Sequence, residues 1–544
     1  MQYHSIGRLS LSLHEYKPHY YFHQTEVNLK EQSFLERISY QMYFLPKFFG
    51  YRRGRYHYTS LSQPQPQPSL RLPSRSYRRL FRLSCCLAIA ILLLVLLTSI
   101  FNPSYTRLPP HYSSLRNAVL NSNHPGRGNQ RNEKVFVAAS LYDPTGSLTQ
   151  GHWGSSILHL INLLGEDNVF LSIYENDSGD EGKAALDSLN RQVPCNKSIV
   201  YEHSLPGLDA LPKVTIPGGS ERIKRIAYLA EARNRALKPL DDPNPSIRYD
   251  KLLYLNDVAF DPIDALHLLF STNFDHDTGK PQYRAACAVD FINPFKFYDT
   301  YATRDLEGYS VGLPFYPWFT NSGTARSRNA VLAGEDAVPV RSCWGGLVAF
   351  DAQFFQPSRT DLPLSGVEGV GGRNANQSSP ARFRALQDVD LFWDASECCL
   401  IHADIQVPQG VEMEMETETE TETNTDTTDE TTTVSTGIFM NPFVRVAYSK
   451  RTLSWLSTTR RFEKLYSIIQ NIGNHLVGLP WLNRRREEVA GQSVDDTVVG
   501  YDGSEKRIRR VAGHDGFCGR PGLQVLVPVR EKGGEGWESI PMAG

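Results

Sequence analysis

The stretch Lys251-Leu-Leu-Tyr-Leu-Asn-Asp-Val-Ala-Phe-Asp-Pro262 decides the fold. The apolar run from Leu252 to Leu255 predicts a buried strand that ends at a polar pair, Asn256 and Asp257. Pro262 suits the first position of a short helix. In open α/β sheets, ligands bind outside the carboxyl ends of the strands, so an acid here would meet a metal ion or a nucleotide phosphate. The alternative is that Asp257 only caps the helix that follows.

Strand-like and helix-like segments alternate upstream of this stretch. The predicted strands are 135–139, 169–174 and 198–201, and the predicted helices are 155–164, 182–189 and 220–238. This alternation predicts an α/β fold, with a mostly parallel sheet and helices on both faces. Neither a GxGxxG loop nor a complete P-loop motif is present. A dinucleotide-dependent enzyme and a P-loop ATPase are therefore disfavoured within the nucleotide-binding α/β class.

The predicted helix 220–238 places a charged residue on its buried side. Ser220 can cap the helix and Pro239 ends it. Arg233 and Asn234 fall on the same stripe as the apolar residues. A buried guanidinium needs a partner, which is either an internal carboxylate or a bound phosphate. The sequence leaves both alternatives open.

Further acids follow apolar runs downstream. Asp290 ends one such run, and the segment Glu397-Cys-Cys-Leu-Ile-His-Ala-Asp404 surrounds a short apolar core with acids and His402. We interpret His402 as lying at the end of a strand, where it is a candidate metal ligand, although a lone histidine is more often structural. The aromatic loop 309–318 suits either stacking on a sugar ring or packing within the loop. The Glu/Thr-rich run 411–434 is predicted to be a disordered insertion.

An uncharged run, 83–101, is about long enough to cross a bilayer as a helix. Four arginines precede it: Arg75, Arg78, Arg79 and Arg82. The positive-inside rule then places residues 1–82 in the cytoplasm, as a mostly disordered tail, and the rest of the chain in a lumen or outside. Residues 102–133 are polar, with scattered Pro and Gly, and are predicted to form a stem that holds the next domain off the membrane.

Charge and cysteine usage agree with this topology. The net charge of -2 gives no basic footprint for nucleic acid. Six cysteines follow the apolar run, which permits a disulfide framework in an oxidising compartment. Sequons for N-glycosylation begin at Asn176, Asn196 and Asn376.

Five motifs resemble those of one family, in the same order. They are Arg233-Asn-Arg-Ala-Leu237, Leu255-Asn-Asp-Val258, Cys343-Trp-Gly-Gly-Leu-Val-Ala-Phe-Asp351, Ser396-Glu-Cys-Cys-Leu-Ile-His-Ala-Asp404 and Asn441-Pro-Phe-Val-Arg-Val-Ala-Tyr448. The chain resembles the fungal capsule-associated α-1,3-mannosyltransferases, glycosyltransferase family 69. The resemblance covers roughly 134–466, and the C-terminal segment 467–544 lies outside it.

The resemblance implies a single-pass type II enzyme of the Golgi membrane with a luminal domain of GT-A fold. It would transfer mannose from GDP-mannose to a mannose-containing glycan acceptor, with retention and with Mn²⁺ or Mg²⁺. Two alternatives remain open. One is a transferase that uses another sugar nucleotide, such as UDP-xylose, and the other is a non-catalytic subunit of a glycan-synthesis complex.

The resemblance also suggests roles for individual residues. Asn256-Asp257 stands where a DxD motif would be, with one carboxylate in place of two, so Asp257 is the expected metal ligand and Asn256 the expected ribose or sugar contact. His402 resembles a late metal ligand. The other expected contacts are Arg233 with Asn234 on phosphate, Glu175 on the nucleoside, and Glu397 and Asp290 on the acceptor or donor face.

Overall fold

The computed structural model describes residues 75–541, except for gaps at 204, 206, 243–245, 358–378, 387–389, 407–434, 480–484 and 528–535. All described residues belong to one unit, Leu61–Gly544. The predicted insertion 411–434 and nearly all of the predicted cytoplasmic tail lie outside the described residues.

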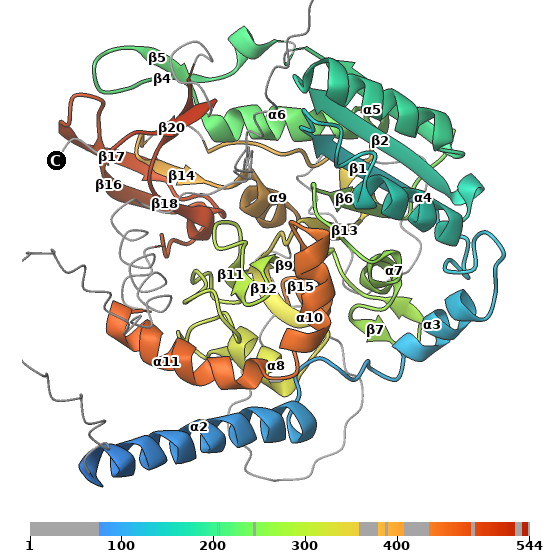
Figure 1. The fold of residues 1–544 in the computed structure, drawn as a ribbon. Coiled ribbons are helices and arrows are strands. Elements are labelled where there is room, and N and C mark those ends of the chain that lie inside the picture. Colours follow the sequence, from blue (N-terminus) through green and yellow to red (C-terminus); the bar gives the residue numbers. More distant parts are fainter. Residues whose placement is uncertain are drawn as a thin grey trace, which may run out of the picture. The chain divides into compact units, whose positions relative to one another are not determined.

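The centre of the domain is a sheet in the order β11-β12-β15-β9-β13-β6-β1-β2-β3, with β10 paired to β9 (Figure 1). The strands on this path are β1 (Val135–Leu141), β2 (Val169–Asn176), β3 (Asn196–Glu202), β6 (Lys251–Leu255), β9 (Ala285–Asn293), β11 (Arg304–Asp305), β12 (Val338–Ser342), β13 (Leu347–Asp351) and β15 (Ile438–Ala447); β10 is Lys296–Phe297. Each of the three upstream strands and β6 lies where the sequence predicts it.

Most strands of this sheet point the same way. The ladders β1–β2, β2–β3, β1–β6 and β9–β15 are parallel. Strand β13 is antiparallel to both β6 and β9, and β12 is antiparallel to both β15 and β11. Only β13 and β12 on this path therefore run against the others. The predicted α/β class with a mostly parallel sheet is confirmed.

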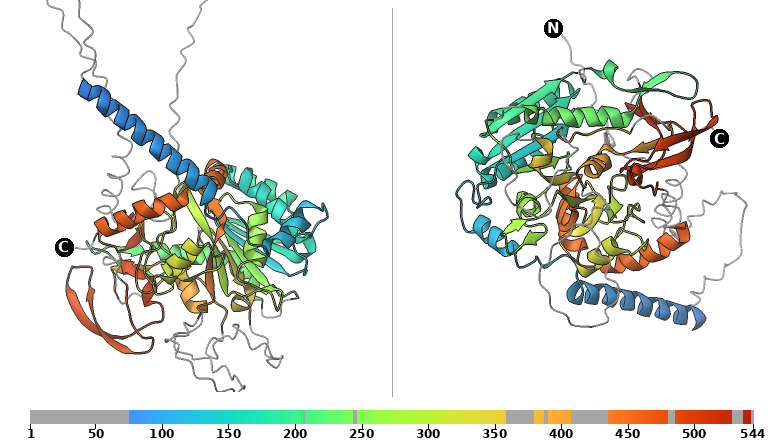
Figure 2. Two further views of the ribbon diagram at one scale, coloured as in Figure 1. Left: turned by 90° about the horizontal axis from the view of Figure 1, so that it is seen from below. Right: turned by 180° about the vertical axis from the view of Figure 1, so that it is seen from behind.

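Helices cover both faces of the sheet (Figure 2). Val135 and Val137 of β1 pack in one core cluster with α4 (His152–Leu164) and α7 (Pro262–Phe270), and α5 (Gly179–Gln192) adds to it. The alternate residues Phe136 and Ala138 pack in a second cluster with α6 (Arg225–Leu237) and α9 (Glu397–Ile405). Because both faces are covered, the strands are apolar at nearly every position.

The junction from β6 to α7 follows the prediction. Strand β6 ends at Leu255, and α7 begins at Pro262. The side chain of Asp261 accepts a hydrogen bond from the Ile263 backbone N–H at 2.8 Å, which makes Asp261 the cap of α7. The capping alternative for Asp257 is therefore wrong.

Two predicted elements differ from the structure. Helix α6 begins at Arg225, because residues before it form a hairpin of β4 (Lys213–Thr215) and β5 (Glu221–Ile223), so Ser220 is not its cap. The segment with His402 is the helix α9 rather than a strand end, and the Ser396 hydroxyl caps it by accepting from the Cys398 N–H. A short apolar run fits either structure, and here the serine cap decides for the helix.

The apolar helix α2 (Arg75–Phe101) leads directly into the folded domain. Its part Arg79–Phe101 is, within the described ranges, the one helix long and apolar enough to cross a membrane. The segment 102–133, interpreted above as a stem, is folded onto the domain: Tyr105 and Tyr112 are buried, and α3 (Tyr112–Leu120) packs against α7. Buried side chains, with Tyr105 and Tyr112 the largest of them, thus anchor a segment whose composition is mostly polar.

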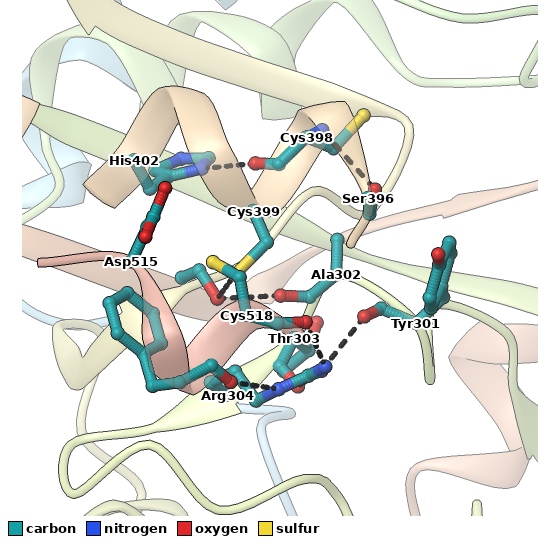
Figure 3. The surroundings of a disulfide bond; sticks show 12 residues. Tyr301, Ala302, Thr303, Arg304, Ser396, Cys398, Cys399, His402, Asp515 and Cys518 are labelled. Carbon is teal, nitrogen blue, oxygen red and sulfur yellow. Dashed lines mark hydrogen bonds between the residues drawn. A yellow bond between two sulfur atoms is a disulfide. The ribbon is translucent and has the colours of Figure 1, made fainter. Parts of the chain in front are cut away.

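The C-terminal segment is joined to the domain by a disulfide and by strand pairing. Cys399 of α9 is bonded to Cys518 (Figure 3). Strand β14 (Trp393–Ala395) pairs with β18 (Gly519–Pro521), and Arg304 donates to the carbonyls of Phe517 and Cys518 at 2.9 and 2.8 Å. A second disulfide joins Cys287 and Cys343. The chain therefore has the expected disulfide framework.

Breaking the C-terminal disulfide is expected to lower stability. Cys518→Ser should reduce the free energy of unfolding by about 2–5 kcal/mol, because the unfolded chain regains the freedom that the cross-link removes. Denaturant unfolding of the full chain in detergent measures the change, with Cys85→Ser in α2, a free cysteine, as control. Peptide mapping without reduction should recover the pairs Cys287–Cys343 and Cys399–Cys518. Equal stability of the two variants would contradict the prediction.

Candidate active site

Acids gather at one edge of the sheet. Because β1, β2, β6 and β9 run in the same direction, their carboxyl ends meet there. Glu175 is the penultimate residue of β2, Asn256 and Asp257 follow β6, and Asp290 lies toward the end of β9. The predicted position of the site at the end of β6 thus coincides with a concentration of carboxylates.

Asn256 is held by three hydrogen bonds. Its backbone N–H donates to the Gly346 carbonyl at 2.9 Å, and its own carbonyl accepts from the Trp153 indole N–H at 2.9 Å. Its side-chain oxygen accepts from Arg233 at 3.0 Å. The residue before Asp257 is therefore fixed in both backbone and side chain.

Arg233 lies on the buried face of α6, as its spacing predicts. Its Nε donates to a carboxylate oxygen of Glu397 at 2.9 Å, and its guanidinium lies 4.6 Å from the centre of the Trp344 ring. Burial by itself lowers the pKa of Arg233, but its neighbours Cys398 and Glu397 raise it above the ordinary value, so the guanidinium stays charged. Of the two alternatives for Arg233, the structure contains the internal salt bridge.

Asp290 and two tyrosines form a second group, which we call the acid–tyrosine cluster (Asp257, Asp290, Asp299, Tyr298 and Tyr448). The hydroxyl of Tyr448 donates to Asp290 at 2.9 Å, and the Asp299 N–H donates to the other Asp290 oxygen at 3.0 Å. The rings of Tyr298 and Tyr448 meet edge to face at 4.6 Å. Burial, followed by the charge of Asp299, raises the pKa of Asp290.

We count Asp257 in this cluster because its charge raises the pKa of both tyrosines. Burial raises the pKa of both tyrosines, and the charges of Asp290 and Asp257 raise each of them further. Unlike the buried Asp290, Asp257 is only half-buried. Asp257 and Asp290 therefore lie near the same two tyrosines, and Asp257 is the more accessible of the two acids.

Glu175 is a buried acid whose carboxylate oxygens make no hydrogen bond of ordinary geometry among the described residues, although the backbone N–H groups of Asp143 and Ser178 lie near enough to lower its pKa slightly. Burial, and then the charge of Asp143, raises its pKa from 4.5 to about 7. A buried acceptor of this kind is costly unless something donates to it. A bound molecule with N–H or O–H groups would supply those donors.

Glu175→Gln is expected to stabilise the protein at alkaline pH. Because the folded pKa lies above the unfolded one, the native state of the wild type loses stability as the pH rises from 4.5 to about 7, and the loss is complete above that range. The free energy of unfolding of the variant should therefore exceed that of the wild type by up to about 3 kcal/mol at pH 8, and this difference should vanish at pH 4.5. Thermal unfolding across this pH range measures the difference. A pH-independent difference would contradict the assigned cause.

Two predicted site residues have other surroundings. The side-chain amide of Asn234 brackets the backbone of Phe383, donating to its carbonyl at 2.8 Å and accepting from its N–H at 2.9 Å. His402 is fully buried on α9, with Nδ1 2.7 Å from the Cys398 carbonyl and Nε2 3.8 Å from the Cys287 sulfur. The metal role of His402 stays a prediction, and its surroundings favour a structural role.

The residues at the strand ends suit a hard divalent cation that takes one or two protein carboxylates as ligands. Within the described ranges, the one group of three possible protein ligands is Cys287, Cys343 and His402, and its two cysteines are joined in a disulfide. The acid–tyrosine cluster, to which Asp257 belongs, contains carboxylate oxygens, which Mg²⁺ and Mn²⁺ prefer. Magnesium is commonly bound through one or two carboxylates, with substrate phosphates and water as the other ligands. Asp257 fits a site of that kind.

Sequence reasoning missed some members of the site. Tyr448 follows β15 and reaches Asp290, although its motif was visible only through the resemblance. Arg225, at the start of α6, is buried, donates to Gln524 at 3.0 Å and interacts electrostatically with Glu397. In the aromatic loop, Tyr316 and Trp318 are buried, which supports the packing alternative over sugar stacking.

The family model described as cryptococcal mannosyltransferase 1 matches residues 134–404. The chain belongs to this mannosyltransferase family. This match confirms the family expected from the five motifs. It includes Glu175, Arg233, Asp257, Asp290 and Glu397, but not Tyr448. The chain is accordingly a glycosyltransferase by family.

Solved structures show only remote likeness. A mannosyltransferase from Pyrobaculum calidifontis, in complex with GDP-mannose and Mn²⁺, is 12% identical, with a TM-score of 0.23, 49% of this chain covered and 56% of that protein. Mannosyl-3-phosphoglycerate synthase from Rubrobacter xylanophilus is 14% identical, with a TM-score of 0.25 and coverages of 75% and 91%. A mycobacterial protein is 11% identical, with a TM-score of 0.25 and coverages of 76% and 92%. The chain thus spans about half of the Pyrobaculum protein. No curated protein matches the chain.

Proposed function

We propose that this protein transfers mannose from GDP-mannose to a mannose-containing acceptor, forming an α-1,3 linkage with retention and with the aid of Mn²⁺ or Mg²⁺. The observation that carries the proposal is the position of Asp257 at the end of β6, in a chain of a mannosyltransferase family. Asp257 follows Asn256, which the Glu397-paired Arg233 holds, and it lies near the tyrosines that Asp290 also affects. A strand-end position beside carboxylates is where a nucleotide sugar would be expected in an open α/β sheet.

In this proposal, Asp257 holds the cation, which acts as a Lewis acid on the leaving diphosphate when bound. Asn256, immobilised by Arg233, fixes the backbone from which Asp257 projects. Glu175 accepts hydrogen bonds from the nucleoside, which supplies well-aligned donors to its buried oxygens. Arg233 thereby acts as a positioning residue, since its Nε bonds to Glu397 and one terminal nitrogen bonds to Asn256.

Asp290 and Glu397 remain the acids for the acceptor or donor face. Asp290 has a raised pKa and accepts hydrogen bonds from Tyr448 and Asp299, so its protonation changes more readily near neutral pH than that of an exposed aspartate. An α-linked donor that gives an α-linked product retains its configuration, and the proposal assigns no enzymic general base.

We also propose a single-pass type II topology, with the domain in the Golgi lumen. The apolar helix α2 and the arginines on its N-terminal side support the orientation, and two disulfides suit an oxidising compartment. Among the sequons, Asn196 is exposed, whereas Asn176 is buried and donates to the Tyr228 hydroxyl at 2.6 Å. Asn196 is therefore the better candidate for glycosylation, and Asn376 lies outside the described residues.

The test is in-vitro transfer by the full chain in detergent, with a panel of sugar nucleotides and α-mannosides. GDP-mannose should be the preferred donor, and linkage analysis should find an α-1,3 product whose formation stops with a chelator and returns with Mn²⁺. Preference for UDP-xylose would replace the donor assignment. Absence of transfer, together with absence of metal-dependent GDP binding in calorimetry, would favour a non-catalytic subunit.

A further inference from the structure

Helix α11 (Tyr466–Val477) has its polar and apolar faces reversed relative to an ordinary surface helix. Its buried residues are polar, Gln470 and Asn474. Four large aliphatic side chains are exposed by more than half of their surface: Ile468 (57%), Ile469 (56%), Ile472 (58%) and Leu476 (78%). A contiguous apolar face of this kind on a soluble domain indicates a contact with another apolar phase or surface.

Hydrogen bonds fix this orientation of α11. The side-chain oxygen of Gln470 accepts from Arg328 at 2.6 Å, and that of Asn474 accepts from the Leu313 N–H at 2.7 Å. Turning the helix to bury its isoleucines would leave these inner groups without their partners. The hydrogen bonds of its inner face therefore hold α11 with its apolar face outward.

The position of α11 in the chain identifies what covers this face. The candidate membrane span of α2 ends at Phe101. The next residue, Asn102, accepts a hydrogen bond from the Lys464 ammonium at 2.9 Å, and the Ser104 N–H donates to the Arg460 carbonyl at 3.1 Å. Lys464 precedes the first residue of α11 by only two positions. A helix that emerges from a bilayer at Phe101 thus delivers the chain directly to the start of α11.

Dimensions and flanking residues agree with a membrane contact. The interfacial layer of a bilayer is roughly 5–7 Å thick on each side. Lying in the membrane plane, α11 would extend about 18 Å along this layer, at 1.5 Å per residue. Tyr466 opens the helix and meets Phe295 at 5.9 Å between ring centres, which puts aromatic rings beside the exit of α2. Aromatic rings and lysine side chains are enriched at the headgroup level of membrane proteins.

We propose that α11 lies in the interfacial layer of the bilayer that α2 crosses, with Ile468, Ile469, Ile472 and Leu476 inserted among the lipids. The inference rests on the proposed membrane span of α2 and is independent of the transfer reaction. The domain then has a second membrane contact besides α2, which fixes its orientation on the membrane.

The experiment uses the full chain in phospholipid nanodiscs and a carbene photoreagent that partitions into the lipid phase. Peptides are then analysed by mass spectrometry. The expected result is labelling of 466–477 together with α2, while the exposed Val489 and Val511 stay at background. Labelling of α2 without α11 would overturn the inference, and so would labelling of Val489 and Val511 equal to that of α11. Absence of label on α2 would instead remove the membrane span on which it rests.

A variant with Ile469→Asp and Ile472→Asp provides the matched comparison, with Val489→Asp as the control at an equally exposed site. The first variant should lose the label on 466–477 and keep the label on α2, with transfer activity in detergent unchanged. If α11 instead covers a second copy of the chain, the wild type will run as a dimer, the variant as a monomer, and α11 will escape the lipid-phase label. That outcome would overturn the membrane assignment.

Discussion

Asp257→Asn is expected to lower kcat/KM for transfer by about 10³-fold or more, because several kcal/mol of cation-assisted stabilisation of the leaving group would be lost. The substitution keeps the size of a half-buried side chain, so the fold should be unchanged. The measurement is the rate of transfer at saturating Mn²⁺, with thermal unfolding to verify the fold.

Asp261→Asn is the matched control for this prediction. Asp261 lies four positions away, and its side chain caps α7 rather than joining the acid–tyrosine cluster. Asparagine is an equally good cap, so activity and stability should both be close to those of the wild type. Full activity of Asp257→Asn that still requires a cation would remove Asp257 from the mechanism.

Glu397→Ala is expected to cost about 3–5 kcal/mol of stability, because it leaves the Arg233 guanidinium buried without a carboxylate. The side chains of this pair are 5% and 0% exposed, so water cannot take the place of the missing partner. Chemical denaturation of wild type and variant measures the loss. Transfer should also fall, since Arg233 positions Asn256 beside Asp257.

The same helix provides a control for the buried pair. Arg235 and Glu231 form a partly exposed i,i+4 pair on α6, and Glu231→Ala should cost no more than about 1 kcal/mol. The double variant Arg233→Met with Glu397→Leu should recover most of the stability and none of the activity. If Glu397→Ala and Glu231→Ala were equally stable, the buried pair would not contribute as described.

Local patterns in the sequence predicted the parts of the fold that depend on neighbouring residues. The run Leu252 to Leu255 predicts β6 because a strand buried on both faces needs apolar residues at successive positions. Helical spacing alone placed Arg233 on the buried face of α6. These predictions need only the periodicity of each element.

Long-range pairing could not be predicted in the same way. The partner of Arg233 is 164 residues away, and the antiparallel β13 is inserted between β6 and β9 by tertiary packing. Residues 397–405 are apolar enough for a strand or a helix, and their type followed from the cap at Ser396. Residues 102–133 resemble a linker by composition, yet Tyr105 and Tyr112 fix them to the core.

In the described part of the chain, α2 is joined to the domain without a flexible segment. If α2 crosses a membrane, this joint would limit the range of heights at which the domain can meet an acceptor. A catalytic domain on a long flexible linker can take many distances from the membrane and so can meet acceptors at many heights. Here the hydrogen bonds of Asn102 and Ser104 to the segment before α11 leave little such freedom. With α2 in a membrane, the strand ends of β6 and β9 would stay at a nearly constant height, so acceptors would have to come to that level.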